Sequence, residues 1–205
     1  MEKILNIKIG IDELLIPTDQ VKIFLKKRGI IRFDGLITES SKEDLLSSGF
    51  KFDTEKPEII IIGFDTELNY EKILRVIKHI NNGVNFVLTH IDPLCPFIDN
   101  QQIPDAGLIE KLIEKSTGKR PIKKFGKPYT DFPKIALEVH GKNINESIIV
   151  GDRINTDIRM ANKLKMDSIL ISQKINKLSA YRPTYSVKSL SDLYKIFTSS
   201  HLKSL

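Results

Sequence analysis

The chain has few cysteines and no long apolar run, which excludes a disulfide-rich protein and a membrane-spanning one. Its 205 residues include one cysteine, Cys95, so no intrachain disulfide can form and a reducing compartment is expected. The longest apolar run, Ile59 to Phe64, is far too short to span a bilayer. The first apolar run after Met1 is short and interrupted, which is not the pattern of a signal peptide. We therefore expect a cytoplasmic protein without a membrane partner.

The charge is positive but has no functional pattern. The formal net charge is +6 and comes mostly from lysine. There is no arginine cluster, no basic run interleaved with aromatic residues and no nucleic-acid motif, so no nucleic-acid partner is expected. A general attraction for anionic substrates is compatible with this charge. The four histidines lack metal-ligand spacing (His79, His90, His140, His201). They are interpreted as surface or satisfied core residues, and His90 is the one that could be an exception.

Apolar strands alternate with amphipathic helices, which is typical of an α/β fold with parallel sheets. The length allows one large or two small domains. Strands are expected near 30–33, 59–63, 84–88, 121–125, 147–150, 167–172 and 184–187. Helices are expected near 2–9, 19–28, 41–48, 70–81, 107–116, 131–140, 156–164 and 189–200. The proline-rich stretch from Asp92 to Ala106 is expected to be a long loop, and such loops are often functional.

The most informative segment runs from Ser147 to Ile158. A β-branched run ends at Gly151 and is followed by two acids, Asp152 and Asp157. Asp152 thus comes at the carboxyl end of a strand, where open α/β sheets bind ligands. Carboxylate oxygens there suit a hard cation such as Mg²⁺ and leave room for a phosphate. A turn with two solvated acids is the competing interpretation.

A second segment, Lys124 to Tyr129, holds a lysine between a glycine and a proline. The glycine permits a sharp turn, and the proline prevents simple continuation of the strand. Lys127 is thereby held at a strand end, where its ammonium can neutralise a phosphate oxygen or a carboxylate. In a lysine-rich chain, Lys127 alone would mean little. Gly-Lys-Pro, a helix and then strand-Gly-Asp-Arg-x-x-Thr-Asp is a much more specific combination.

This combination resembles the haloacid dehalogenase (HAD) superfamily, and in particular its C2-cap branch of NagD-like, 4-nitrophenyl, phosphoglycolate and pyridoxal phosphate phosphatases. Segments 59–72 and 85–93 are similar to cap strands of that branch, in which many members have Thr-Asn-x-Asp where this chain has Thr89-His90-Ile91-Asp92. Asp105 stands where the family often has glycine. The resemblance implies an α/β fold: a HAD-like Rossmannoid core with an inserted α/β C2-type cap.

The core is expected to be incomplete, with its first βαβ unit missing. The family's catalysis begins with Asp-x-Asp-Gly after an N-terminal strand, and the sequence contains no such motif. The run Ile30 to Thr38 resembles it superficially, but Arg32 stands at the nucleophile position, so the run is interpreted as a cap strand. A truncated gene or miscalled start, a gap filled by another strand or partner, and a decaying paralogue all remain open.

The resemblance implies a division into a core remnant at 1–16, a C2-type cap at 17–120 and the rest of the core at 121–205. It implies Mg²⁺ as cofactor with Asp152 as ligand, and catalytic roles for Lys127 and Asp157. Substrate selection would fall to Asp92, Leu94 and Cys95, the substrate being a small phosphorylated metabolite. A homodimer through the cap is possible. Without its nucleophile, this chain is expected to be inactive alone; the alternative is a non-catalytic ligand-binding or partner-binding protein.

Overall fold

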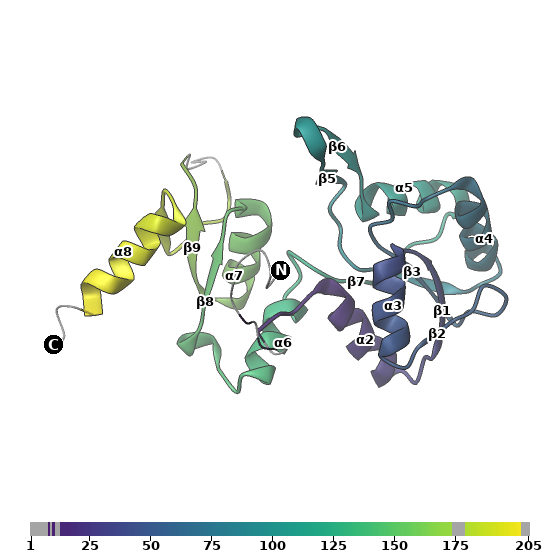
Figure 1. Cartoon of the computed structure of the whole chain (residues 1–205), viewed down its shortest axis with the longest axis horizontal. Helices are drawn as coiled ribbons and strands as arrows, with labels where there is room; N and C mark the ends of the chain where they lie inside the picture. Colours follow the sequence, from purple (N-terminus) through teal and green to yellow (C-terminus); the bar gives the residue numbers. More distant parts are fainter. Residues whose placement is uncertain (1–7, 9, 11–12, 174–178, 202–205) are drawn as a thin grey trace. The chain divides into compact units, whose positions relative to one another are not determined.

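The computed structural model describes residues 8, 10, 13–173 and 179–201, which form two compact units (Figure 1). One unit runs to Gly126 and the other begins at Lys127. The division expected from sequence ends the cap at residue 120, whereas the first unit includes the short strand β7 (Lys123–Lys124), because β7 pairs with that unit's sheet. The expected helix at 2–9 lies outside the described residues, apart from Lys8.

The first unit is built on a five-stranded parallel sheet in the order β2-β1-β3-β4-β7. Its strands are β1 (Arg32–Leu36), β2 (Lys51–Phe52), β3 (Ile59–Ile62), β4 (Asn85–Leu88) and β7. The central strand β3 is Ile59-Ile60-Ile61-Ile62 and is fully buried, as expected for a parallel strand covered on both faces. The segment that superficially resembles a nucleophile motif is therefore strand β1 of this sheet.

Two hydrophobic clusters fill the two faces of this sheet. Helices α2 (Pro17–Lys27) and α3 (Glu39–Ser47) pack on one face, against Ile59 and Ile61. Helices α4 (Tyr70–Asn81) and α5 (Ala106–Thr117) pack on the other, against Ile60 and Ile62. Successive residues of a strand point to opposite faces, so one isoleucine run serves both clusters. The result is a three-layered α/β unit.

Helix α4 shows how local sequence sets these elements. The Asn69 side chain accepts a hydrogen bond from Lys72 N at 2.9 Å and so caps the first turn. Val76 and Ile80 lie on the buried face. Gly83 follows with φ of 93°, a left-handed conformation that glycine adopts without strain, and the chain turns into β4.

The expected loop from Asp92 to Ala106 is in fact mostly a β-hairpin. Strands β5 (Leu94–Pro96) and β6 (Gln102–Pro104) pair antiparallel, and a 3₁₀ turn, η1 (Ile98–Asn100), joins them. Each strand contains a proline, which argues against a strand because it removes a backbone donor. A two-stranded ribbon tolerates this loss, since each strand has one unpaired edge.

The second unit has a smaller parallel sheet, ordered β10-β9-β8. It contains helices α6 (Asp131–Val139), α7 (Arg159–Leu164) and α8 (Leu190–His201) and strands β8 (Ile148–Gly151), β9 (Asp167–Ile171) and β10 (Tyr185–Val187). A 3₁₀ turn, η2 (Ile144–Glu146), precedes β8, and a π-helical turn, η3 (Ile154–Ile158), leads into α7.

One edge of β8 pairs with no strand among the described residues. Ile148 and Val150 are 41% and 43% exposed, although both are apolar and β-branched. Such side chains are typical of a strand inside a sheet. Within the described ranges, no helix is long and apolar enough to cross a membrane.

Candidate active site

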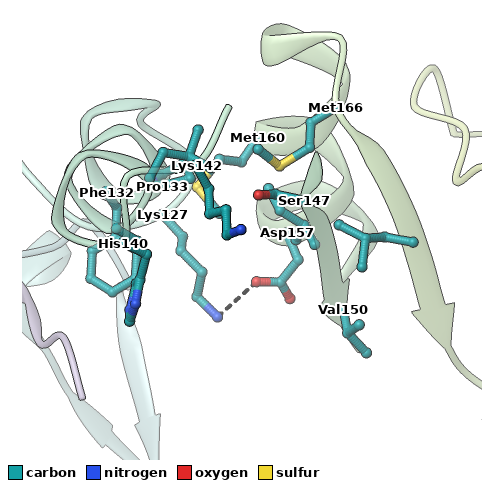
Figure 2. Close-up of a pocket in the computed structure, with 14 residues that line it drawn as sticks. Lys127, Phe132, Pro133, His140, Lys142, Ser147, Val150, Asp157, Met160 and Met166 are labelled. Carbon is teal, nitrogen blue, oxygen red and sulfur yellow. Dashed lines mark ion pairs between the residues drawn. The ribbon is translucent and has the colours of Figure 1, made fainter. Parts of the chain in front are cut away.

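The second unit places Lys127 and Asp157 in direct contact (Figure 2). The ammonium Nζ of Lys127 lies 2.8 Å from Oδ1 of Asp157. The lysine side chain is 43% exposed, whereas the carboxylate is only 6% exposed. The buried Asp157 carboxylate therefore holds the Lys127 ammonium in place, and the exposed side of the ammonium can bind a second anion.

The loop after β8 fixes the carboxylate. Arg153 N donates a hydrogen bond to Asp157 Oδ2 at 3.1 Å, so each oxygen of Asp157 has a partner. The Asp157 and Ile158 amides both donate to the Arg153 carbonyl, which winds the π-helical turn η3. The expected helix at 156–164 thus begins as a π turn, and π turns are frequent at functional sites.

Gly151 is the residue that lets Asp157 reach this position. A Cβ built on Gly151 would lie 2.4 Å from Asp157 Cβ and 2.6 Å from Asp157 Oδ2. Real Cβ atoms do not come so close to other atoms. The glycine at the end of β8 is therefore needed so that the carboxylate can lie against the strand.

Asp152 lies in the exposed bend directly after β8. In the described part of the chain, no three His, Cys, Asp or Glu residues gather closely enough to hold a metal ion. Asp157, the nearest acid in sequence, is paired with Lys127. Asp152 by itself does not make a magnesium site, because Mg²⁺ requires near-octahedral oxygen ligation. The residues present thus supply at most part of one.

A cavity of about 480 Å³ borders the Lys127–Asp157 pair. Its wall is mostly apolar and comes from α6, β8 and the start of α7, with Phe132, Val150 and Met160 among its residues (Figure 2). Lys127, His140, Lys142 and Asp157 are its charged or ionisable members. The volume is in the range of small-molecule sites.

The three cap residues expected to select substrate lie in and before the hairpin of the first unit. Leu94 and Cys95 belong to β5 and are partly exposed, and the Cys95 thiol is free. Asp92 precedes the hairpin, and its backbone carbonyl accepts a hydrogen bond from Gly107 N at 2.9 Å. A Cβ at Gly107 would lie 2.4 Å from the Ile91 carbonyl oxygen, so only glycine permits this closure.

Sequence reasoning missed a hydrogen-bonded chain at the end of β4. His90 Nε2 lies 2.7 Å from Asp105 Oδ1, and His90 Nδ1 lies 2.8 Å from Thr89 Oγ1. Asp105 also caps α5 by accepting from Ala106 N. The signal that could have found it is the pair of departures from the family pattern, at His90 and at Asp105.

Comparison with known proteins gives three kinds of similarity. The HAD-hydrolase-like family model matches residues 124–193. The 5'-nucleotidase YutF of Bacillus subtilis is 27% identical over 159 residues, which are 75% of this chain and 61% of that protein. An acid sugar phosphatase of Staphylococcus aureus is 31% identical over 143 residues, 67% of this chain and 54% of its own length.

A solved 4-nitrophenylphosphatase of Thermotoga maritima superposes with a TM-score of 0.87 at 27% identity, covering 95% of this chain and 76% of that one. The chain belongs to the HAD superfamily, in its NagD-like branch. The resemblance inferred from the Gly-Lys-Pro and Gly-Asp segments is thus confirmed, as is the α/β fold class. The chain spans only a little over half the length of the curated relatives it matches. Their names place phosphatase chemistry in this part of the superfamily.

Proposed function

We propose that the second unit carries part of a phosphatase site for small phosphorylated metabolites, and that the site works only once a nucleophilic carboxylate completes it. The observation that carries the proposal is the 2.8 Å ion pair of Lys127 and Asp157 beside the end of β8. An ammonium held by a buried carboxylate is preorganised to meet a transferring phosphoryl group. The 205-residue chain has no Asp-x-Asp-Gly, so we expect it to be inactive alone.

Each residue has a proposed role. Lys127 neutralises the nucleophile and the phosphoryl oxygens, and Asp157 holds Lys127 in place. Asp152 would be one ligand of Mg²⁺ if further carboxylates joined it, and the metal would supply positive charge against the phosphoryl oxygens.

The remaining proposals concern the cap, the partners and the compartment. Residues 17–120 act as a C2-type cap, and Asp92, Leu94 and Cys95 choose the substrate. A homodimer through the cap, a cytoplasmic location and the absence of nucleic-acid or membrane partners belong to the same proposal, supported by the single free cysteine and the unpatterned charge.

The test uses 4-nitrophenyl phosphate with Mg²⁺. We expect no phosphate release by the chain alone, and release after addition of the N-terminal segment of a complete relative that bears Asp-x-Asp-Gly. In the completed enzyme, Lys127→Met and Asp152→Asn should each lower kcat by about 100-fold or more, as the loss of a preorganised charge does. Lys134→Met, an exposed lysine on α6, is the matched control.

Two results would contradict the proposal. Mg²⁺-dependent turnover by the chain alone would show that it already contains a nucleophile. Equal effects of Lys127→Met and Lys134→Met would remove Lys127 from the site.

The unpaired edge of β8 favours a second candidate function, partner binding without catalysis. A parallel strand added there would cover Ile148 and Val150 and satisfy the backbone groups along the edge. The same N-terminal segment, added as a separate polypeptide, is the probe. In calorimetry, Val150→Lys should weaken binding of this segment to the chain. Leu74→Lys, at an exposed position of α4, should not weaken it. Binding without any turnover would favour this candidate, and equal binding by both variants would reject it.

A further inference from the structure

A second, smaller cavity lies within the first unit, at the carboxyl edge of its five-stranded sheet. It has a volume of about 190 Å³. Its lining comes from the residues that follow three strands: Ile37 after β1, Gly63 and Phe64 after β3, and Thr89 and His90 after β4. The carboxyl edge of an open parallel sheet is where such folds bind ligands. We call this cavity the Thr18 pocket, after the residue discussed next.

Thr18 lines the pocket and lacks a partner. Its residue is 8% exposed, and its hydroxyl is buried with no hydrogen bond. A buried hydroxyl without a partner costs about 1–3 kcal/mol, so such groups are normally satisfied. The hydroxyl therefore lacks a partner that a molecule bound beside Thr18 could supply.

Gly63 also lines the pocket and keeps space free there. A Cβ on Gly63 would lie 2.9 Å from Thr89 Oγ1 and 3.2 Å from the Ile37 side chain. Any other residue here would press against Thr89 and reduce the space. The backbone of Gly63 itself is tied into the sheet, because its amide donates to the Leu36 carbonyl at 2.8 Å.

His90 and Thr89 supply adaptable hydrogen-bonding groups. His90 Nε2 is held by Asp105 Oδ1 at 2.7 Å, and its Nδ1 contacts Thr89 Oγ1 at 2.8 Å. Because a carboxylate only accepts, Nε2 carries a proton towards Asp105. With the proton on Nε2, Nδ1 of the neutral ring accepts from the Thr89 hydroxyl.

Two helices begin at the pocket. Ile16, Pro17 and Thr18 form the start of α2, and Ser41 lies in the first turn of α3. The amino ends of helices carry partial positive charge and favour anions. Protein carboxylates already use this property here, since Ile16 N donates to Asp19 Oδ2 at 2.9 Å and Glu39 N donates to Glu67 Oε2 at 3.1 Å. Lys22 offsets the charge of Asp19 through a contact of 3.1 Å.

We propose that the Thr18 pocket binds a small oxyanion, a phosphate or a carboxylate, through the hydroxyl of Thr18, beside the amino ends of α2 and α3. The volume corresponds to about six water molecules at roughly 30 Å³ each, which admits phosphate or a short carboxylic acid. The site shares no residue with the Lys127–Asp157 pair.

The experiment is isothermal titration of the full chain with inorganic phosphate and, separately, with acetate. The two arms distinguish a tetrahedral from a planar anion. Thr18→Val removes the hydroxyl at nearly constant shape and should weaken binding about tenfold, the equivalent of one hydrogen bond. Gly63→Ala should abolish it. Thr66→Val, at an exposed loop position, should leave it unchanged. The titrations are repeated with Lys127→Met, so that phosphate bound near Lys127 does not count as binding in the Thr18 pocket.

A second readout guards against misfolding. Without anion, Thr18→Val should keep or raise the melting temperature, since it removes an unsatisfied buried hydroxyl. With anion, wild type should gain stability and Thr18→Val should gain less. Absence of binding by both anions, or equal binding by wild type and Thr18→Val, would overturn the proposal. Loss of binding in Lys127→Met would assign the anion to the second unit instead.

Discussion

His90 Nε2 lies 2.7 Å from Asp105 Oδ1. At both positions the family resemblance predicts another residue, asparagine at 90 and glycine at 105. The two departures therefore form one pair. Asp105 is buried, and its side chain also caps α5 by accepting a hydrogen bond from Ala106 N. The buried carboxylate of Asp105 and the partly buried imidazole of His90 satisfy each other.

Restoring the family residues singly should therefore destabilise the first unit. Asp105→Gly leaves His90 Nε2 without its acceptor, and His90→Asn leaves Asp105 with Ala106 N alone as a donor, so each should cost about 1–3 kcal/mol of unfolding free energy. The double variant should recover part of this loss, with a coupling of about 0.5–3 kcal/mol. Urea unfolding measures it, with the exposed Glu43→Gln as control; strict additivity would show that the pair is not coupled.

Asp34 and Arg75 offer a stronger test of a buried charge. The Asp34 side chain is fully buried in β1, and Arg75 donates to both of its oxygens, at 2.8 and 3.0 Å. The hydrogen bond to Asp34 raises the pKa of Arg75 above its ordinary value, so the guanidinium stays charged.

Arg75→Met should lower the unfolding free energy by about 3–5 kcal/mol, because it leaves an uncompensated buried carboxylate. Adding Asp34→Asn should recover part of that loss. Chemical denaturation compares the unfolding free energies of Arg75→Met and of the double variant Arg75→Met/Asp34→Asn. If Arg75→Met were the more stable of the two, the electrostatic explanation would be refuted.

Gly151→Ala should disturb the candidate active site directly. Its methyl group would overlap the Asp157 side chain, so that side chain or the strand end must move, at about 1–3 kcal/mol for an overpacked position. Gly49→Ala provides the contrast: nothing lies within 4 Å of its added Cβ, and only the positive φ of 91° opposes it, at about 1 kcal/mol. In the completed enzyme, we expect Gly151→Ala to lower turnover and Gly49→Ala to leave it intact. Similar turnover in both would show that the position of Asp157 is not critical.

Glu58 should make stability depend on pH. Hydrogen bonds from the backbone amides of Arg32 and Ile31 lower the pKa of Glu58 below its ordinary value of 4.5. A lowered folded-state pKa gives stability that is present above the unfolded value and is lost as pH falls through the folded one. The denaturation midpoint of Glu58→Gln should thus lie below that of wild type at pH 7 and approach it below about pH 4. A difference that is constant between pH 3 and pH 7 would contradict this.

Much of the fold could be predicted from local sequence because the relevant signals are local. The Asn69 cap, the apolar spacing in α4 and the turn at Gly83 fix a helix at 70–81 as predicted. The four isoleucines of β3 similarly predict a strand with both faces covered. The hairpin of β5 and β6 was missed because Pro96 and Pro104 normally interrupt strands, and only the pairing of the two segments overrides that preference.

The sites were harder to predict, because their geometry depends on contacts between distant segments. The sequence predicts that Lys127 and Asp157 both follow strands, but it does not predict their ion pair. The ion pair depends on the packing of the Asp157 side chain against Gly151. Arg75, the partner of Asp34, lies 41 residues away on α4. The pocket that contains Thr18 forms only where the ends of three strands and the starts of two helices come together. Such relations belong to tertiary structure.

Both hydrophobic clusters found in the described residues belong to the unit that ends at Gly126. Heat and proteases should therefore act on the two units unequally. Limited digestion should trim the segment after Gly126 while the α2–β7 portion survives, and amide hydrogens in β3 should be the last to exchange with deuterium.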